Sequence, residues 1–182
     1  MNKYLKAALA ASALLAILVS VSACKTKTPA DLVITARSPA PDFTATDVVT
    51  GKQVTLSSYA GKLVILNFEN YGCSQATNDQ VSSQLLIIQQ IYKQRSDVMP
   101  VSVFCGCCPP DVLRKFATDN GLDWPLILDT GGSIVAKYSA FNGSITYPTL
   151  FLIDKCQQVR EVTGFTDLAA LNQKLDALAA GK

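Results

Sequence analysis

The sequence contains no histidine at all. Without an imidazole, the chain cannot use histidine for acid–base catalysis or as a metal ligand. It also carries almost no net charge, because setting aside Lys3 and Lys6 of the N-terminal segment leaves 14 basic residues against 14 acidic ones. A neutral surface argues against nucleic acid and against a basic membrane-binding patch. The chemistry of the chain must therefore come from other side chains.

The N-terminal segment lacks an apolar stretch long enough to span a membrane. Two lysines precede an apolar core over residues 7–21, and small residues follow it, which is the pattern of a secretory signal peptide. This core is shorter than the roughly 20 apolar residues of a spanning helix. We therefore expect residues 1–23 to be a signal peptide.

The end of this segment, Val21-Ser22-Ala23-Cys24, resembles the lipobox of bacterial lipoproteins. The resemblance implies that Cys24 is acylated and becomes the mature N-terminus, with residues 24–38 as a polar tether. The protein would then be an extracytoplasmic lipoprotein held at the membrane by its lipid. The alternative is a plain secreted protein in which Cys24 is free.

Five cysteines remain after Cys24, and an extracytoplasmic location makes them disulfides or redox groups. They are Cys73, Cys105, Cys107, Cys108 and Cys156. Because five is an odd number, at least one thiol is free or pairs with another molecule. Cys156 follows Asp154-Lys155 in a predicted turn, and we expect it to be an exposed or idle thiol.

Strands and helices alternate along residues 39–180, which we expect to form one domain. Apolar runs predict strands at 63–68, 98–104, 126–128, 149–153 and 159–163, and helical spacing predicts helices at 74–95, 110–120, 133–138 and 167–180. Two short strands around a turn precede them, within residues 42–58. This order predicts an α/β sandwich with a mixed sheet and an N-terminal β-hairpin.

Cys73 stands at the head of the first long helix, directly after a buried strand and a short turn. The helix dipole and the unpaired N–H groups at such a position favour a thiolate. A dithiol motif would place a second cysteine three residues later, where this chain has Ala76. The pattern predicts thiol chemistry with one cysteine in the motif.

Three segments of this sequence resemble the thioredoxin-like redoxins, in particular the TlpA/ResA branch related to AhpC/TSA proteins. They are APDFTATDVVTGKQVTLSSYAGKLVILNF, NFENYGC and Tyr147-Pro148-Thr149. The resemblance implies a thioredoxin-like three-layer sandwich, with Cys73 as nucleophile, Asp79 as the acidic residue of the site and Pro148 in a cis-proline loop facing the thiol. It also implies a thiol-disulfide oxidoreductase that needs no cofactor, acts on protein thiols and disulfides, and receives electrons from a membrane reductant.

The sequence departs from this family in the motif itself. Ala76 replaces the resolving cysteine, Glu69 replaces a tryptophan, and Val81 replaces a proline. Ala76 is compatible with a natural monothiol site and with an engineered cysteine-to-alanine change. Both leave Cys73 as the only cysteine of the motif.

A second cluster, Cys105-Gly106-Cys107-Cys108, follows the strand that we expect beside the Leu63 strand. Sites in open α/β sheets are built at this carboxyl edge. Three interpretations stay open: these thiols resolve a disulfide or sulfenic acid on Cys73, they bind copper or zinc as thiolates, or they are structural.

Two further functions on the same scaffold are alternatives. A thiol peroxidase of the peroxiredoxin type has a threonine three residues before its cysteine and a proline upstream, whereas this chain has Asn70 and no proline between Gly61 and Cys73. A non-catalytic binding module is the second alternative, because a fold does not fix an activity.

Overall fold

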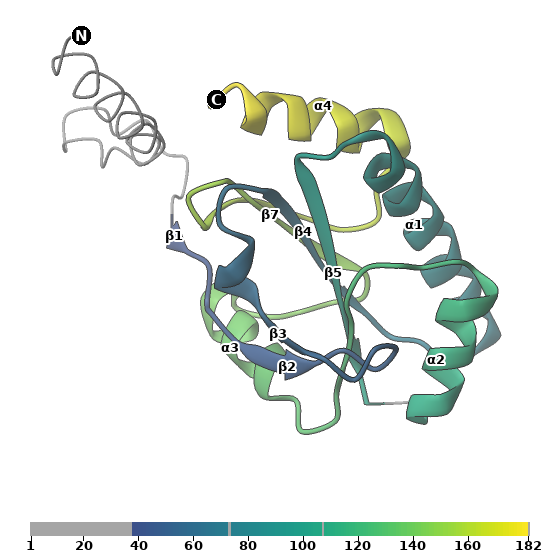
Figure 1. Cartoon of the computed structure of the whole chain (residues 1–182). Helices are drawn as coiled ribbons and strands as arrows, with labels where there is room; N and C mark the ends of the chain where they lie inside the picture. The colour runs from purple at the N-terminus through teal and green to yellow at the C-terminus, as the bar shows by residue number, and fades with distance from the viewer. Residues whose placement is uncertain (1–37, 73, 107, 182) are drawn as a thin grey trace, which may run out of the picture. The chain divides into compact units, whose positions relative to one another are not determined.

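The centre of the computed structural model, which describes residues 38–72, 74–106 and 108–181, is a six-stranded sheet in the order β1-β8-β7-β4-β5-β6. The three strands β4, β5 and β6 are parallel, and β7, β8 and β1 add antiparallel pairs, so the sheet is mixed, as predicted. The strands β2 and β3 form the predicted N-terminal hairpin (Figure 1). The elements are β1 (Ser38–Pro39), β2 (Thr44–Thr46), β3 (Gln53–Thr55), a 3-10 turn (Leu56–Tyr59), β4 (Leu63–Glu69), α1 (Gln75–Gln94), β5 (Val98–Cys105), α2 (Pro110–Asp119), β6 (Leu126–Asp129), α3 (Ser133–Asn142), β7 (Thr149–Ile153), β8 (Gln158–Thr163) and α4 (Leu168–Ala179).

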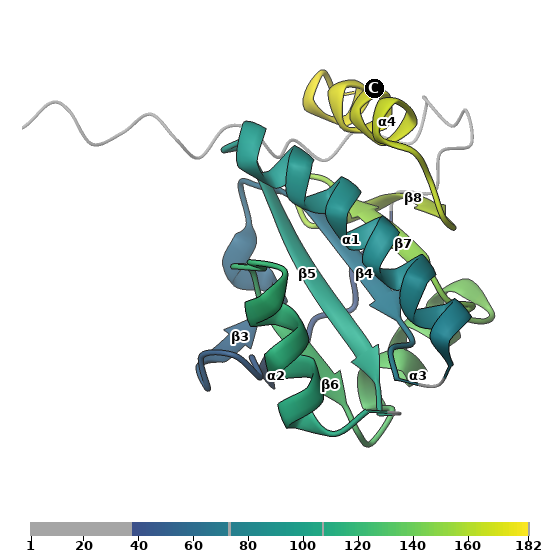
Figure 2. The ribbon, with the colours of Figure 1, turned by 90° about the vertical axis from the view of Figure 1, so that its right-hand side faces the viewer.

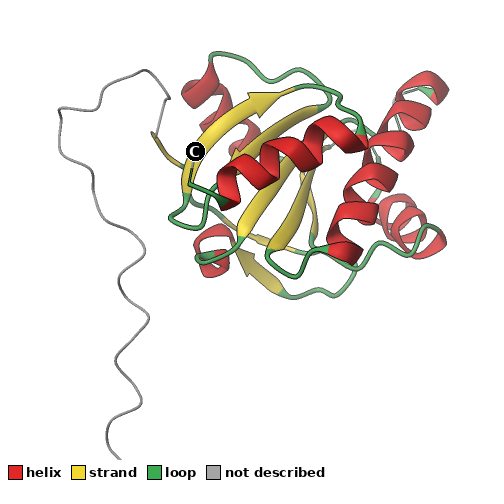
Figure 3. Ribbon diagram, turned by 90° about the horizontal axis from the view of Figure 1, so that it is seen from above, coloured by secondary structure: helices red, strands yellow, loops and turns green. Residues whose placement is uncertain are grey.

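Helices cover both faces of the sheet and make it the middle of three layers. The helices α1, α2 and α4 pack on one face, which is turned to the viewer in Figure 2, while α3 and the β2–β3 hairpin lie on the other (Figures 1 and 3). Every residue of β4 is buried. Leu63 and Ile65 join the core under α1, and Val64 and Leu66 join the core under α3. A strand covered on both faces explains the continuous apolar run in the sequence.

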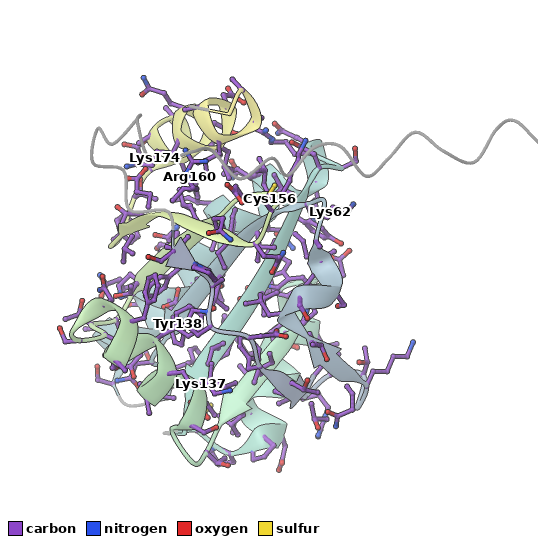
Figure 4. The ribbon with its side chains drawn as sticks, turned by 90° about the vertical axis from the view of Figure 1, so that its left-hand side faces the viewer. Lys62, Lys137, Tyr138, Cys156, Arg160 and Lys174 are labelled. Carbon is purple, nitrogen blue, oxygen red and sulfur yellow. The ribbon has the colours of Figure 1, made fainter. Side chains whose placement is uncertain are left out.

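The core under α3 is built around the fully buried ring of Tyr138, which is labelled in Figure 4. Its centroid lies 4.8 Å from that of Phe151 and 5.1 Å from that of Phe68. Burial raises the pKa of Tyr138 far above its ordinary value. This aromatic packing fixes β4 and β7, the two strands that lead to the site.

The structure differs from the predicted elements mainly at their ends. α1 begins at Gln75, because the Ser74 side chain caps it by accepting a hydrogen bond from the Thr77 backbone N–H at 3.2 Å. α3 continues to Asn142, four residues beyond its predicted end. β1 was not predicted, because two residues carry no readable period. No helix within the described residues is long and apolar enough to cross a membrane.

Candidate functional site

The carboxyl ends of β4 and β5 lie side by side, since the two strands are parallel with Glu69 opposite Phe104. This confirms that the Cys105–Cys108 run follows the neighbour of the Leu63 strand. Figure 2 shows the β4–α1 and β5–α2 connections at the same edge of the sheet. Cys73, Cys107 and Cys24 lie outside the described residues, and the side chains around them define the site.

Cys105 links two segments that are far apart in the sequence. Its thiol donates a hydrogen bond to Asn70 Oδ1 at 3.1 Å, in the turn between β4 and α1. It also forms a side-chain hydrogen bond with Tyr147, which precedes Pro148. Burial raises the pKa of Tyr147, and the nearby Cys105 raises it further. The half-buried Cys105 therefore joins the turn before Cys73 to the Pro148 loop.

Cys108 packs against Gly72, the residue directly before Cys73 in the chain. A Cβ atom added to Gly72 would lie only 2.7 Å from the Cys108 Cβ atom, and Gly72 has a φ of +90°. Only glycine fits this close approach and this backbone conformation. Tyr71 also lies near Cys108, whose charge adds to burial in raising the pKa of the Tyr71 hydroxyl. Cys108 is therefore held against the turn that contains the predicted nucleophile.

The first turn of α1 places the remaining motif residues. The side chain of Asn78 accepts a hydrogen bond from the Gly72 backbone N–H at 2.7 Å and so fixes the turn. Asp79 is exposed, and its carboxylate accepts a hydrogen bond from Gln75 at 2.8 Å. Ala76 is exposed as well. The role of Asp79 in the site stays a prediction, while Asn78, which the sequence analysis missed, makes the direct contact.

The Tyr147–Pro148 peptide bond is cis, as the family resemblance implied. Pro148 is buried, and its carbonyl oxygen lies 3.7 Å from a Cβ atom built on Gly164. The next residue, Phe165, is 50 % exposed. Together with Asp79 it lines an open surface pocket beside α1. An exposed aromatic ring next to a buried proline loop can contact a partner chain.

A buried polar chain ends at Glu69, directly before the turn. Trp124 Nε1 donates to Ser102 Oγ at 2.9 Å, and Ser102 donates to Asn67 Oδ1 at 2.7 Å. Asn67 Nδ2 in turn donates to Glu69 Oε1 at 3.0 Å. Oε2 of Glu69 is buried and has no hydrogen-bond partner among the described residues. Burial raises the pKa of Glu69 to about 8, although the bond from Asn67 opposes the shift.

Sequence analysis recorded Glu69 only as a departure from the family pattern. An ionisable residue at the end of a largely apolar, fully buried strand is the signal that would have identified a buried acid. Its neutral form is the one that suits a fully buried position.

The expectation for Cys156 was wrong. This residue is half-buried in the β7–β8 turn and is disulfide-bonded rather than an exposed or idle thiol. In this turn the Lys155 carbonyl oxygen accepts a hydrogen bond from the Gly61 N–H, so the turn lies at the opposite edge of the sheet from the site. Figure 4 labels Cys156 beside Lys62. Five cysteines leave at least one unpaired, but their number does not tell which one, so it could not identify Cys156 as the free thiol.

A thiolate metal site remains a prediction. Over residues 38–72, 74–106 and 108–181, no group of three or more cysteine or acidic side chains is arranged to hold a metal ion. Cys107, one of the three proposed ligands, lies outside these ranges.

The AhpC/TSA family model matches residues 36–162. The thiol-disulfide oxidoreductase ResA of Geobacillus thermodenitrificans is 32% identical over 143 residues, covering 78% of this chain and 76% of that protein. Peroxiredoxin-2 of Cricetulus griseus is 33% identical over 132 residues, covering 69% and 67%.

Among solved structures, the pneumococcal exposed lipoprotein thioredoxin of Streptococcus pneumoniae is 27% identical with a TM-score of 0.59, over 76% of this chain and all of that one. The match in fold agrees with the three layers and the mixed sheet described above. The chain therefore belongs to the AhpC/TSA family and is a thioredoxin-like redoxin of the ResA type.

Proposed function

We propose that this protein is an extracytoplasmic thiol-disulfide oxidoreductase that acts on protein disulfides through Cys73. The observation that carries the proposal is that the β4–α1 turn, the β5–α2 connection and the Pro148 loop contact one another through two thiols. Cys105 bonds to Asn70 and Tyr147, and Cys108 packs on Gly72. These contacts surround the turn that leads into Cys73. ResA, a curated relative, is named for the same activity.

The proposed reaction is thiolate attack on a disulfide. Cys73 directly precedes Ser74, the cap of a 20-residue helix, so the helix N-terminus favours its thiolate. The thiolate attacks one sulfur of the partner disulfide, forms a mixed disulfide and releases the other sulfur as a thiolate. The Pro148 loop and the exposed Phe165 contact the partner chain, and Asp79 assists proton transfer at the rim.

Anchoring to the membrane is part of the same proposal and rests on the motif at Cys24. The pneumococcal neighbour is itself an exposed lipoprotein. Expression of the full chain with and without Cys24→Ala tests this, using membrane fractionation and incorporation of a labelled fatty acid. Loss of both label and membrane association in the variant is the expected result, and membrane association without label would contradict the lipid anchor. A membrane-bound dithiol is the proposed reductant.

The activity is tested with the reduced protein and a peptide that carries a mixed disulfide with glutathione. Tryptic digestion separates Cys73, in peptide 63–93, from the Cys105–Cys108 run, in peptide 96–114. In samples quenched in acid early in the reaction, the expected product joins the substrate peptide to peptide 63–93, and Cys73→Ser should abolish it. If the substrate reacts only with 96–114, or consumption of hydrogen peroxide exceeds disulfide reduction, the proposal fails.

A further inference from the structure

The outer two cysteines of the Cys105–Cys108 run are three residues apart, the spacing of a redox dithiol motif. β5 ends at Cys105, and α2 begins at Pro110 with Pro109 as its cap. The pair therefore occupies a strand-to-helix junction, as such motifs do. It stands beside the β4–α1 junction, where the second cysteine of the motif is missing and Ala76 takes its place.

Both thiols lie against the same turn, which runs from Asn70 to Gly72. Burial raises the pKa of the Cys108 thiol, and the charge of Cys105 adds to the same shift. Both are present as thiols. Each also contacts the turn before Cys73: Cys105 through Asn70 Oδ1 at 3.1 Å, and Cys108 through its close approach to Gly72.

We propose that Cys105 and Cys108 form a second redox centre, a dithiol that becomes an intramolecular disulfide when a mixed disulfide on Cys73 is resolved. The oxidant in this scheme is the partner disulfide, so the inference rests on the proposed function for its substrate. With this dithiol, a chain that has Ala76 in place of the resolving cysteine can still complete a catalytic turnover.

The chemistry takes two exchange steps after the mixed disulfide has formed. The Cys108 thiolate attacks Cys73, the Cys73–Cys108 bond forms, and the partner sulfur leaves as a thiolate. The Cys105 thiolate then attacks Cys108, the Cys105–Cys108 bond forms, and Cys73 leaves as a thiolate. One partner disulfide has been reduced to two thiols and two cysteines have been oxidised, so two electrons balance. The protons of Cys105 and Cys108 pass to the two partner thiolates, and an external dithiol later reduces the new disulfide.

Equilibrium mapping on the unmodified full chain is the first test. The reduced protein is poised at a series of glutathione potentials, quenched in acid, alkylated and digested with trypsin. Peptide 96–114 holds all three cysteines of the run, and peptides 63–93 and 156–160 hold Cys73 and Cys156. The expected result is one two-electron transition in 96–114, with fragment spectra showing that Cys107 alone is alkylated. The inference is overturned if 96–114 stays alkylated at all three positions, or if its final oxidised form is a cross-link to 63–93.

Kinetic variants give the second test, with a control from the same run. Cys108→Ala should trap the partner on Cys73, and Cys105→Ser should trap a cross-link between peptides 63–93 and 96–114, each with turnover reduced by about tenfold or more. Cys107→Ser is the matched control and should keep turnover within about twofold of wild type, since it takes part in neither exchange. Loss of turnover in Cys107→Ser, with full turnover in Cys105→Ser, would overturn the assignment.

The two proposals can fail separately. Repeating the equilibrium mapping in Cys73→Ser removes the proposed nucleophile but leaves the dithiol. A transition in 96–114 that persists there, without any partner complex on Cys73 in the Cys108→Ala protein, would refute the function of Cys73 and keep the second redox centre. A partner complex on Cys73 without the transition in 96–114 would keep the function of Cys73 and refute the second redox centre.

Discussion

Replacing Glu69 by glutamine should make the protein more stable than wild type, and this difference should grow as the pH rises. The carboxyl group is fully buried, accepts a hydrogen bond from Asn67 through Oε1, and has no described partner at Oε2. Glutamine has the shape of the protonated acid and can still accept the bond from Asn67. It differs from the native residue chiefly in having no charge to bury.

The magnitude follows from the difference between the folded and unfolded states. Burial raises the pKa of Glu69 from 4.5 to about 8. Below pH 4.5 the carboxyl is protonated in both states and there is no penalty. Between these values the folded state binds the extra proton, so stability falls by about 1.4 kcal/mol per pH unit. The total loss approaches about 5 kcal/mol above pH 8, and is about 3 kcal/mol at pH 7.

Urea unfolding of wild type and Glu69→Gln at pH 5, 7 and 8 measures this directly. The two proteins should differ by no more than about 1 kcal/mol at pH 5, and the variant should be more stable by about 3–5 kcal/mol at pH 8. Glu161→Gln, which removes a half-exposed carboxylate paired with Lys174, is the control for loss of one carboxyl group. A constant free-energy difference between wild type and Glu69→Gln across this pH range would refute the argument that Glu69 is held neutral by burial.

Two further substitutions probe the turn and the motif. Gly72→Ala should lower the free energy of unfolding by about 1–3 kcal/mol more than Gly51→Ala does. Both glycines have positive φ, but only at Gly72 would the new Cβ atom press against Cys108. Equal losses in urea unfolding would show that Cys108 can move away. Ala76→Cys, introduced into the Cys108→Ala background, should restore disulfide turnover by about tenfold or more. If that double variant stays trapped as a Cys73 complex, the missing cysteine is not what limits release.

Much of the fold was predictable because its signals are local and repeated. The run over 63–66 is apolar throughout because both faces of β4 are covered, and Ser74 caps α1 where the helical spacing begins. The cis bond at Pro148 was different, since nothing in the residues around it distinguishes cis from trans. Only the family resemblance carried that prediction.

The contacts of the site were out of reach of the sequence for a physical reason. The bond between Cys105 and Asn70 spans 35 residues, and it exists only because two parallel strands end in register. Patterns of hydrophobicity place residues on strands but do not report which side chain meets which across an edge. The same limit hid Asn78, which reaches back to Gly72, and the disulfide of Cys156.

The proposed role of Cys105 and Cys108 accounts for a motif on α1 that lacks its second cysteine. Neighbouring strands lie roughly 5 Å apart, and bridged cysteines need Cα atoms within about 7 Å, so a thiol at the end of β5 can serve the same space as one in the first turn of α1. A resolving group on a separate loop is free of the helix and depends instead on Asn70, Tyr147 and Gly72 for its position. Substitutions in the Pro148 loop should therefore change resolution as well as partner binding, a coupling that a dithiol contained within α1 would not produce.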